Sequence, residues 1–237
     1  QTILVLGAAY LAVFWEAAGG WQVDRLTLAQ YCQEAEVKYV GVNCGLMDQF
    51  ASANGVEDHL VYFDTRSLDW QPVPLPPGTA IVIADSTMRR SLSNSAYNER
   101  RAQCEQAVRL LQADLPEIAS LRDVLPAEFN RYASHLPPVI EKRARHVVEE
   151  IARVEAAVAA LDEGDVQHFG QFMLAGHASL RDLYEVSIPE LDALVEIARG
   201  LPGCLGARLT GAGFGGCTIN LVEVDQDKAA GGILQPG

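Results

Sequence analysis

The chain has 237 residues, 49% of them hydrophobic and 21% charged, which gives enough apolar surface for a globular core. Its net charge of −13 argues against nucleic acid or an anionic membrane surface as the main partner, but not against a phosphorylated ligand held by backbone N–H groups and a metal ion. No apolar run reaches the roughly 18 residues that a membrane span needs. The first residues do not form a secretory signal either, so we expect a soluble, cytoplasmic protein.

The first part of the chain is predicted to contain three helices. Residues 8–20 are apolar almost all round and end in two glycines, which indicates a buried helix. The next helix is expected over residues 24–41, with Asp24 as its N-cap. Its apolar face comprises residues at helical spacing: Leu28, Cys32, Ala35 and Tyr39. A third, short helix ends at Gly55 and holds Asp48 in its first turn, where a carboxylate is usually no more than a helix-start charge.

Two β segments follow, over residues 59–76 and 79–87. The second, TAIVIADST, is apolar enough to be buried on both faces of a sheet. The connection between the two segments is marked by four prolines: Pro72, Pro74, Pro76 and Pro77.

The second half of the chain is predicted to be mainly helical. The periodicity of apolar residues predicts helices over these ranges: 93–113, 137–165, 166–184 and 187–200. Ser187 is expected as the N-cap of the last one and Gly200 as its terminator. Residues 207–224 then form a strand, a Gly-rich turn and a second strand, so the overall class is α+β.

The Gly-rich turn GAGFGG matches G-x-G-x-x-G through Gly211, Gly213 and Gly216. The dinucleotide-binding fingerprint needs a helix after this motif, but the next residues, CTINLV, are typical of a strand. A P-loop is excluded because no Lys-Ser/Thr pair follows. Four glycines in six residues are more than a hairpin needs, which favours a close approach of the backbone to a ligand or to another loop.

The cysteines are scattered, odd in number and never spaced as C-x-x-C: Cys32, Cys44, Cys104, Cys204 and Cys217. This pattern disfavours a zinc site and a disulfide framework, and it predicts reduced thiols that act as small packing residues, Cys44 and Cys217 included. The histidines also lack metal-ligand spacing, so no residue is assigned as a metal ligand.

Four segments together resemble the galactokinases, of the GHMP superfamily of small-molecule kinases. They cover about a third of the chain: CGLMDQFASANG (44–55), SNSAYNERRAQCEQAVRLL (93–111), GHASLRDLYEVSIPELDALVEIA (176–198) and LTGAGFGGCTINLV (209–222). The last segment alone is typical of the whole superfamily, whereas the four together indicate galactokinase. The resemblance implies a two-domain, GHMP-kinase-like α+β architecture.

The resemblance also implies a reaction and residues that perform it. The reaction is ATP-dependent phosphorylation of galactose at its 1-hydroxyl, with Mg²⁺ bridging the phosphates. Asp48 is the catalytic carboxylate near that hydroxyl, acting as base or as electrostatic stabiliser. Gly45 offers backbone to the sugar and Tyr97 offers a phenolic hydrogen bond. The loop that closes on the nucleotide phosphates is shaped by Gly211, Gly213, Phe214 and Gly216.

Other polar residues in these segments are expected to be structural. Arg100 and Arg101 would lie on a solvated or ion-paired helix face rather than bind phosphate. His177 and Arg181, four residues apart on a helix, would make structural hydrogen bonds. We therefore expect galactose and ATP as partners and a monomeric protein.

Two motifs of the family are absent from the sequence: an N-terminal sugar-binding motif and a Gly-Leu-Ser-Ser-Ser phosphate loop. The family places the latter directly before the helix that residues 8–20 resemble. We expect discontinuities before residue 8 and near residues 225–232, although a true fragment or a degenerate paralogue would explain the same absences. The expected domains are an incomplete N-terminal domain (1–57), a C-terminal GHMP-kinase-like domain (58–222) and a discontinuous tail (223–237).

Two alternative functions remain open at this stage. One is a kinase of a related sugar, such as N-acetylgalactosamine, galacturonate or arabinose, because the residues that would separate these sugars lie mostly in the absent motifs. The other is a non-catalytic paralogue that binds sugar and nucleotide.

Overall fold

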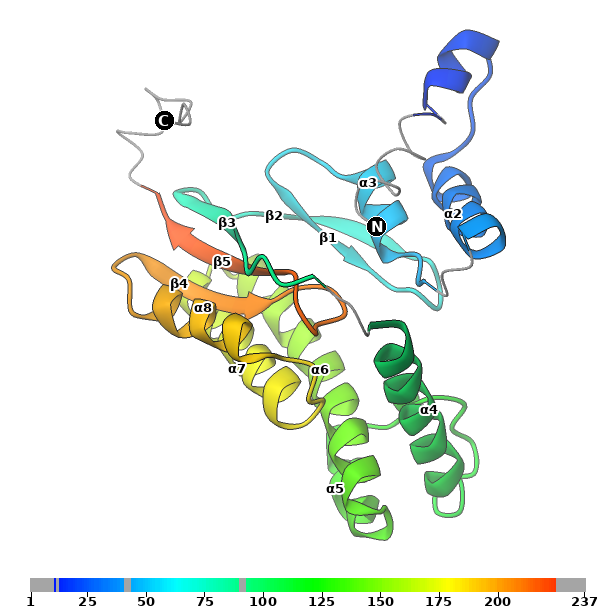
Figure 1. Ribbon diagram of the computed structural model, residues 1–237, viewed down its shortest axis with the longest axis vertical. Coiled ribbons are helices and arrows are strands. Elements are labelled where there is room, and N and C mark those ends of the chain that lie inside the picture. The colour runs from blue at the N-terminus through cyan, green and yellow to red at the C-terminus, as the bar shows by residue number, and fades with distance from the viewer. Residues whose placement is uncertain (1–10, 12, 41–43, 90–92, 225–237) are drawn as a thin grey trace. The chain divides into compact units, whose positions relative to one another are not determined.

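The computed structural model describes residues 11, 13–40, 44–89 and 93–224 (Figure 1). The chain divides into two compact units between Leu75 and Pro76. The expected domain limits at 57/58 and 222/223 stay a prediction, and the expected discontinuities lie outside the described residues. Among the described residues, no helix is both long and apolar enough to cross a membrane.

The first unit consists of short helices and one β-hairpin. After a helix that includes residues 13–19, its elements are α2 (Arg25–Ala35), the π-helical turn η1 (Glu36–Val40), α3 (Met47–Asn54), β1 (His59–Phe63) and β2 (Trp70–Pro74). The two strands are antiparallel. Asp24 is the N-cap of α2, as predicted, because its carboxylate accepts a hydrogen bond of 2.9 Å from the Thr27 N–H.

Packing in this unit fixes α3 against the hairpin. The Phe50 ring of α3 stacks on Phe63 of β1, with 3.9 Å between ring centroids, and meets Trp70 of β2 edge-on at 5.7 Å. Phe50 is fully buried. The helix start that carries Asp48 therefore rests on a defined aromatic cluster.

Several expectations for the first unit are wrong. Tyr39 is 88% exposed, because the π-helical turn holds more residues per turn than an α-helix and rotates it off the face of Leu28 and Cys32. The described part of the helix over 8–20 is exposed apart from Glu16, since few described side chains cover it. Pro72 and Pro74 lie within β2 rather than in a connection, which a two-stranded ribbon tolerates because both strands are edges.

The second unit combines a three-stranded antiparallel sheet with a layer of helices (Figure 1). Its elements are β3 (Thr79–Asp85), α4 (Ser93–Leu111), η2 (Leu121–Asp123), α5 (Pro126–Tyr132), η3 (Ala133–His135), α6 (Pro138–Asp162), α7 (Val166–Asp182), α8 (Pro189–Arg199), β4 (Cys204–Leu209) and β5 (Cys217–Glu223). The strand order is β3-β5-β4. The helices α4, α5 and α6 share one apolar core, in which Leu111, Phe129 and Val148 are fully buried.

Three features of the second unit differ from the sequence predictions. The turn-and-helix segment η2–α5–η3 was not predicted. Strand β3 is not buried on both faces: Val82 and Ile83 point to opposite faces, and their side chains are 47% and 68% exposed, so neither face is fully covered at this point of the strand. Helix α8 starts one residue later than expected, with Ile188 as N-cap, and Ser187 donates to the Asp192 carboxylate at 2.6 Å.

Candidate active site

Asp48 lies in the first turn of α3 and is exposed, as the sequence predicted for the helix start. Its side chain makes no hydrogen bond with the described residues, and its backbone carbonyl accepts one from Ser52. Gly45, three residues earlier, is also exposed, and a Cβ built there would meet nothing within 4 Å. This carboxylate is therefore available to a hydroxyl group from outside the chain.

The residue after Asp48 anchors this helix start to α2 and its π-helical turn. Gln49 is buried, and its Nε2 donates to Oε1 of the buried Glu36 at 2.8 Å. Gln33 Nε2 donates to the Cys44 carbonyl at 3.0 Å, and the Cys44 thiol lies 3.9 Å from the other oxygen of Glu36. Burial, and then the Glu36 charge, raise the pKa of Cys44, so this thiol stays protonated and packs rather than reacts.

The Gly-rich turn approaches another loop of the same chain on one side. The Phe214 N–H donates to the Val186 carbonyl at 2.7 Å. Gly213 has a φ of +77°, and a Cβ there would sit 2.2 Å from the same carbonyl oxygen. The Phe214 ring packs against the buried cluster that contains Val186 and Leu209. Backbone packing within the protein therefore requires a residue without a Cβ at position 213.

On its other side, the turn is joined to the segment after β3. Ser86 donates to the Gly216 carbonyl from its N–H at 2.9 Å and from its hydroxyl at 2.6 Å. The Gly216 N–H donates to the Met88 carbonyl at 3.1 Å. Gly211 is the member of the turn that is exposed, with a φ of +77°. The predicted close approach to another loop is confirmed for Gly213, and Gly211 presents backbone to solvent.

Tyr97 lies near the start of α4 and is 40% exposed. One turn later, Arg101 pairs with Glu105 at 3.1 Å, as predicted for an ion-paired helix face. Arg100 is also ion-paired, with Glu99 at 3.3 Å, but its side chain is largely buried and donates to the backbone carbonyls of Tyr184 and Glu185 as well.

His177 and Arg181 make structural contacts, as predicted. The His177 Nδ1 accepts a hydrogen bond of 3.3 Å from the Leu209 N–H. Its Nε2 lies 3.1 Å from the Asp192 carboxylate, but outside hydrogen-bond geometry. Burial lowers the pKa of His177 despite this carboxylate, so a neutral ring suits the position. Arg181 binds the carboxylate of its neighbour, Asp182, through two nitrogens.

Comparison with known families shows which family the chain and its two site segments come from. Residues 3–56 match the family "GHMP kinases N terminal domain", and residues 157–234 match "GHMP kinases C terminal". The chain belongs to the GHMP kinases. The first match contains Gly45 and Asp48 and the second contains the Gly-rich turn, whereas Tyr97 lies between the two matches.

Among GHMP kinases, the chain is similar to galactokinases. It is 50% identical over 196 residues to galactokinase from Roseiflexus sp. (strain RS-1). The matched region covers 83% of this chain and 50% of that protein. It is 49% identical over 202 residues to galactokinase from Chloroflexus aurantiacus, covering 85% of this chain and 52% of that one. The chain spans about half the length of the curated relatives that it matches.

A solved structure shows the same fold. The crystal structure of Lactococcus lactis galactokinase complexed with galactose superimposes with a TM-score of 0.85 and 39% sequence identity. The match covers 93% of this chain and 57% of that chain. The expected GHMP-kinase-like architecture is confirmed.

The predicted site residues of this GHMP kinase fall into two groups. Gly45 and Asp48 lie in the first unit, three residues apart, with Gly45 just before α3 and Asp48 in its first turn. Tyr97 and the Gly-rich turn lie in the second unit. The roles assigned to them in binding sugar and nucleotide stay predictions.

The described residues do not form a protein cage for Mg²⁺. Among them, no three His, Cys, Asp or Glu side chains come together as a metal-binding group. Kinase-bound Mg²⁺ usually takes one or two carboxylates and completes its shell with water and substrate phosphates. The binding of Mg²⁺ stays a prediction.

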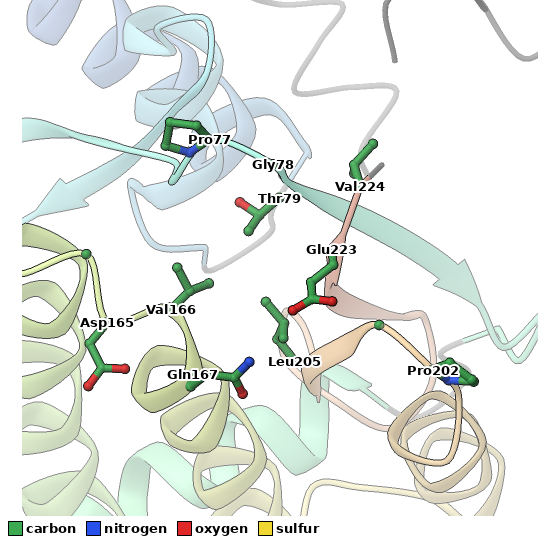
Figure 2. Close-up of a pocket in the computed structure, with 12 residues that line it drawn as sticks. Pro77, Gly78, Thr79, Asp165, Val166, Gln167, Pro202, Leu205, Glu223 and Val224 are labelled. Atoms are coloured by element: carbon green, nitrogen blue, oxygen red, sulfur yellow. The ribbon is translucent and has the colours of Figure 1, made fainter. Parts of the chain in front are cut away.

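A surface hollow of about 770 Å³ lies at the other end of β5 from the Gly-rich turn (Figure 2). It is lined by Pro77, Gly78, Thr79, Gly164, Asp165, Val166, Gln167, Pro202, Gly203, Leu205, Glu223 and Val224. This lining contains none of the predicted site residues. The hollow is therefore separate from the Gly-rich turn, which precedes β5 at its other end.

Proposed function

We propose that this protein transfers the terminal phosphoryl group of ATP to the 1-hydroxyl of galactose, giving galactose 1-phosphate. The observation that carries the proposal is 50% identity to a galactokinase over 83% of the chain. The likeness to a galactokinase complexed with galactose supports the choice of sugar. A monomeric enzyme in the cytoplasm stays part of the prediction.

In this proposal Asp48 acts on the attacking hydroxyl. Phosphoryl transfer needs positioned reactants, neutralised charge and a group that orients or deprotonates the nucleophile. The exposed carboxylate at the start of α3, held in place by the buried Gln49 beside it, suits that task. A positioned base contributes a factor of about 10²–10⁴.

The other residues in the proposal bind the two substrates. Gly45 would present backbone to the sugar and Tyr97 a phenolic hydroxyl, since both are exposed. Gly211 would face the ATP phosphates, while Gly213, Phe214 and Gly216 hold the turn in shape through the bonds described above. Mg²⁺, when bound, would offset negative charge on the phosphates.

The test is a sugar panel assayed with ATP on the full-length protein. We expect a clear preference for galactose and product phosphorylated at the 1-hydroxyl. Preference for N-acetylgalactosamine, galacturonate or arabinose would replace galactose by that sugar. Binding of galactose without turnover would favour the non-catalytic paralogue.

The role of Asp48 is tested by Asp48→Asn, which keeps the shape of the side chain and removes its charge. We expect kcat to fall by about 10²–10⁴ with the protein still folded. The matched control is Asp69→Asn, because Asp69 is an exposed aspartate in the hairpin of the same unit. Unchanged turnover in Asp48→Asn would remove Asp48 from the mechanism.

A further inference from the structure

The segment after α7 offers four successive backbone carbonyls that are all hydrogen-bonded by groups distant in the sequence. The residues are Leu183, Tyr184, Glu185 and Val186. Arg143 donates to the first carbonyl, Arg100 to the second and third, and a backbone N–H of the Gly-rich turn to the fourth. Because all four carbonyls accept hydrogen bonds from distant parts of the chain, this segment is held in place by the surrounding structure, unlike an ordinary surface loop.

Arg143 is the buried member of this arrangement. Its side chain, from α6, is 4% exposed. Its guanidinium donates to the Leu183 carbonyl, to the Glu185 carboxylate at 2.6 Å and to the Gln103 amide oxygen at 3.1 Å. A buried cation is stable only when its donors are satisfied, so this geometry fixes both α6 and the segment beyond α7.

Arg100 reaches the same segment from α4. Its Nε donates to the Tyr184 carbonyl at 2.7 Å and its Nη2 to the Glu185 carbonyl at 3.1 Å. Glu185 is held at a φ of +54°, an uncommon conformation for a residue with a Cβ. The Gln103 amide oxygen accepts from both arginines, at 3.4 Å from Arg100. The two side chains therefore act as a single unit.

Val186, the residue after Glu185, connects this segment to the Gly-rich turn. Val186 is buried, and its carbonyl accepts the Phe214 N–H at 2.7 Å. Gly213 lies so close to the same carbonyl that even one methyl group would not fit. A shift of Val186 would therefore displace the turn.

We infer that Arg100 and Arg143, the arginine clasp, are positioning residues that hold the Gly-rich turn in the conformation that receives the nucleotide phosphates. The phosphate role of the turn rests on the proposed function, whereas the mechanical link from the clasp to the turn rests on the bonds above. Arg100 lies three residues after Tyr97 on α4, so one helix carries both the predicted sugar contact and half of the clasp.

The experiment compares clasp variants with a matched arginine on the full-length protein. The clasp variants are Arg100→Met and Arg143→Lys; the second keeps the buried charge but loses the planar fork. The control is Arg145→Met: Arg145 lies on the same helix as Arg143 and pairs with Glu141 and Glu149. Hydrogen exchange of peptides spanning residues 209–217 and steady-state kinetics with ATP are measured on each.

We expect amide exchange in the Gly-rich turn to rise about tenfold in both clasp variants, the size expected for losing one charged hydrogen bond. The KM for ATP should rise by a similar factor with kcat little changed. Arg145→Met should change neither. If one clasp variant fails to fold, the other gives the same readouts.

Unchanged turn exchange and ATP KM in a folded clasp variant would overturn the inference. Loss of global stability without a selective effect on residues 209–217 would overturn it as well, because it would mean an ordinary core contact. Amide hydrogen exchange can be measured whether or not the protein turns over a substrate. If the wild-type protein phosphorylates no sugar, the proposed function fails while the exchange result still decides whether the clasp holds the turn.

Discussion

His146 is a histidine that the fold keeps neutral. It is buried on α6, its Nδ1 lies 2.8 Å from the Ser179 hydroxyl, and its ring stacks on Tyr184 with 4.5 Å between centroids. Burial lowers its pKa to about 4; of the charged groups around it, one carboxylate raises the pKa and three guanidinium groups lower it. These groups are Glu150, Arg153, Arg208 and Arg143. Neutral imidazole is therefore part of the packed structure.

This lowered pKa predicts a pH-dependent stability. Between about pH 6.5 and pH 4 the unfolded chain binds the proton of His146 and the folded chain does not, so the free energy of unfolding rises with pH across that window. The contribution is fully present above pH 6.5 and is lost as the pH falls towards 4. Each pKa unit corresponds to about 1.4 kcal/mol, which gives about 3 kcal/mol in all.

Urea unfolding of the wild type and of His146→Gln, from about pH 7 to about pH 4.5, measures this contribution. We expect the variant to be less stable near neutral pH and to lose less stability on acidification. His135→Gln is the control, since His135 is exposed. The same pH dependence in His146→Gln and wild type would contradict the assignment.

At the scale of elements, the β4–β5 hairpin depends on glycine at one position more than its sequence motif indicates. Gly213→Ala combines a positive φ with a Cβ 2.2 Å from the Val186 carbonyl. Gly164→Ala is the matched control: its φ is +73°, but nothing lies within 4 Å of the added carbon. The control should lose about 1–2 kcal/mol from backbone strain alone.

We expect Gly213→Ala to lose more, about 3 kcal/mol or above, because the clash adds to the strain. Exchange of the Phe214 amide should also accelerate, since its bond to Val186 cannot survive the displacement. Thermal or urea unfolding of the two variants measures the difference. Equal losses in both would mean that the turn moves aside at no cost.

The elements that sequence periodicity predicted well are those whose partners lie nearby in the chain. Helices α2, α4, α6 and α7 and the β4–β5 hairpin were found because apolar spacing and turn residues are local signals. Tyr39 was misplaced because a π-helical turn has no clear sequence signature. Burial of β3 was overestimated because an apolar strand sequence does not reveal whether a neighbour covers it.

The same limit applies to the candidate site. Asp48 and the Gly-rich turn were predicted from short motifs. The structure places Asp48 at a helix start and Gly213 against the backbone of Val186. The supports around them were not predicted. Gln49 finds its partner 13 residues away, and Arg100 finds its carbonyls more than 80 residues away. Such pairs follow from the tertiary fold.

At the scale of the whole molecule, the two units differ in how much core holds them together. Among the described residues, the first unit has five buried apolar side chains: Leu28, Ala29, Cys32, Phe50 and Val73. The second unit has twenty-one. The first unit also exposes large apolar side chains, including Leu11, Phe14, Trp15, Trp21 and Tyr39. Small units with little buried surface are only marginally stable.

We therefore expect the first unit of this 237-residue chain to unfold at a lower urea concentration than the second. Two optical probes separate the units. All three tryptophans lie in the first unit, and Trp70, packed on Phe50, reports whether α3 rests on the hairpin. Most long helices lie in the second unit, so far-ultraviolet circular dichroism reports mainly on that unit.

The fluorescence midpoint should precede the midpoint from circular dichroism, because non-coincident transitions are the mark of units that unfold separately. Trp70→Phe serves as the control: it should remove most of the fluorescence change, since Trp15 and Trp21 are already about half exposed in the folded chain. Superimposable transitions would mean that the two units unfold as one. The small core of the first unit would then be stabilised through its coupling to the second.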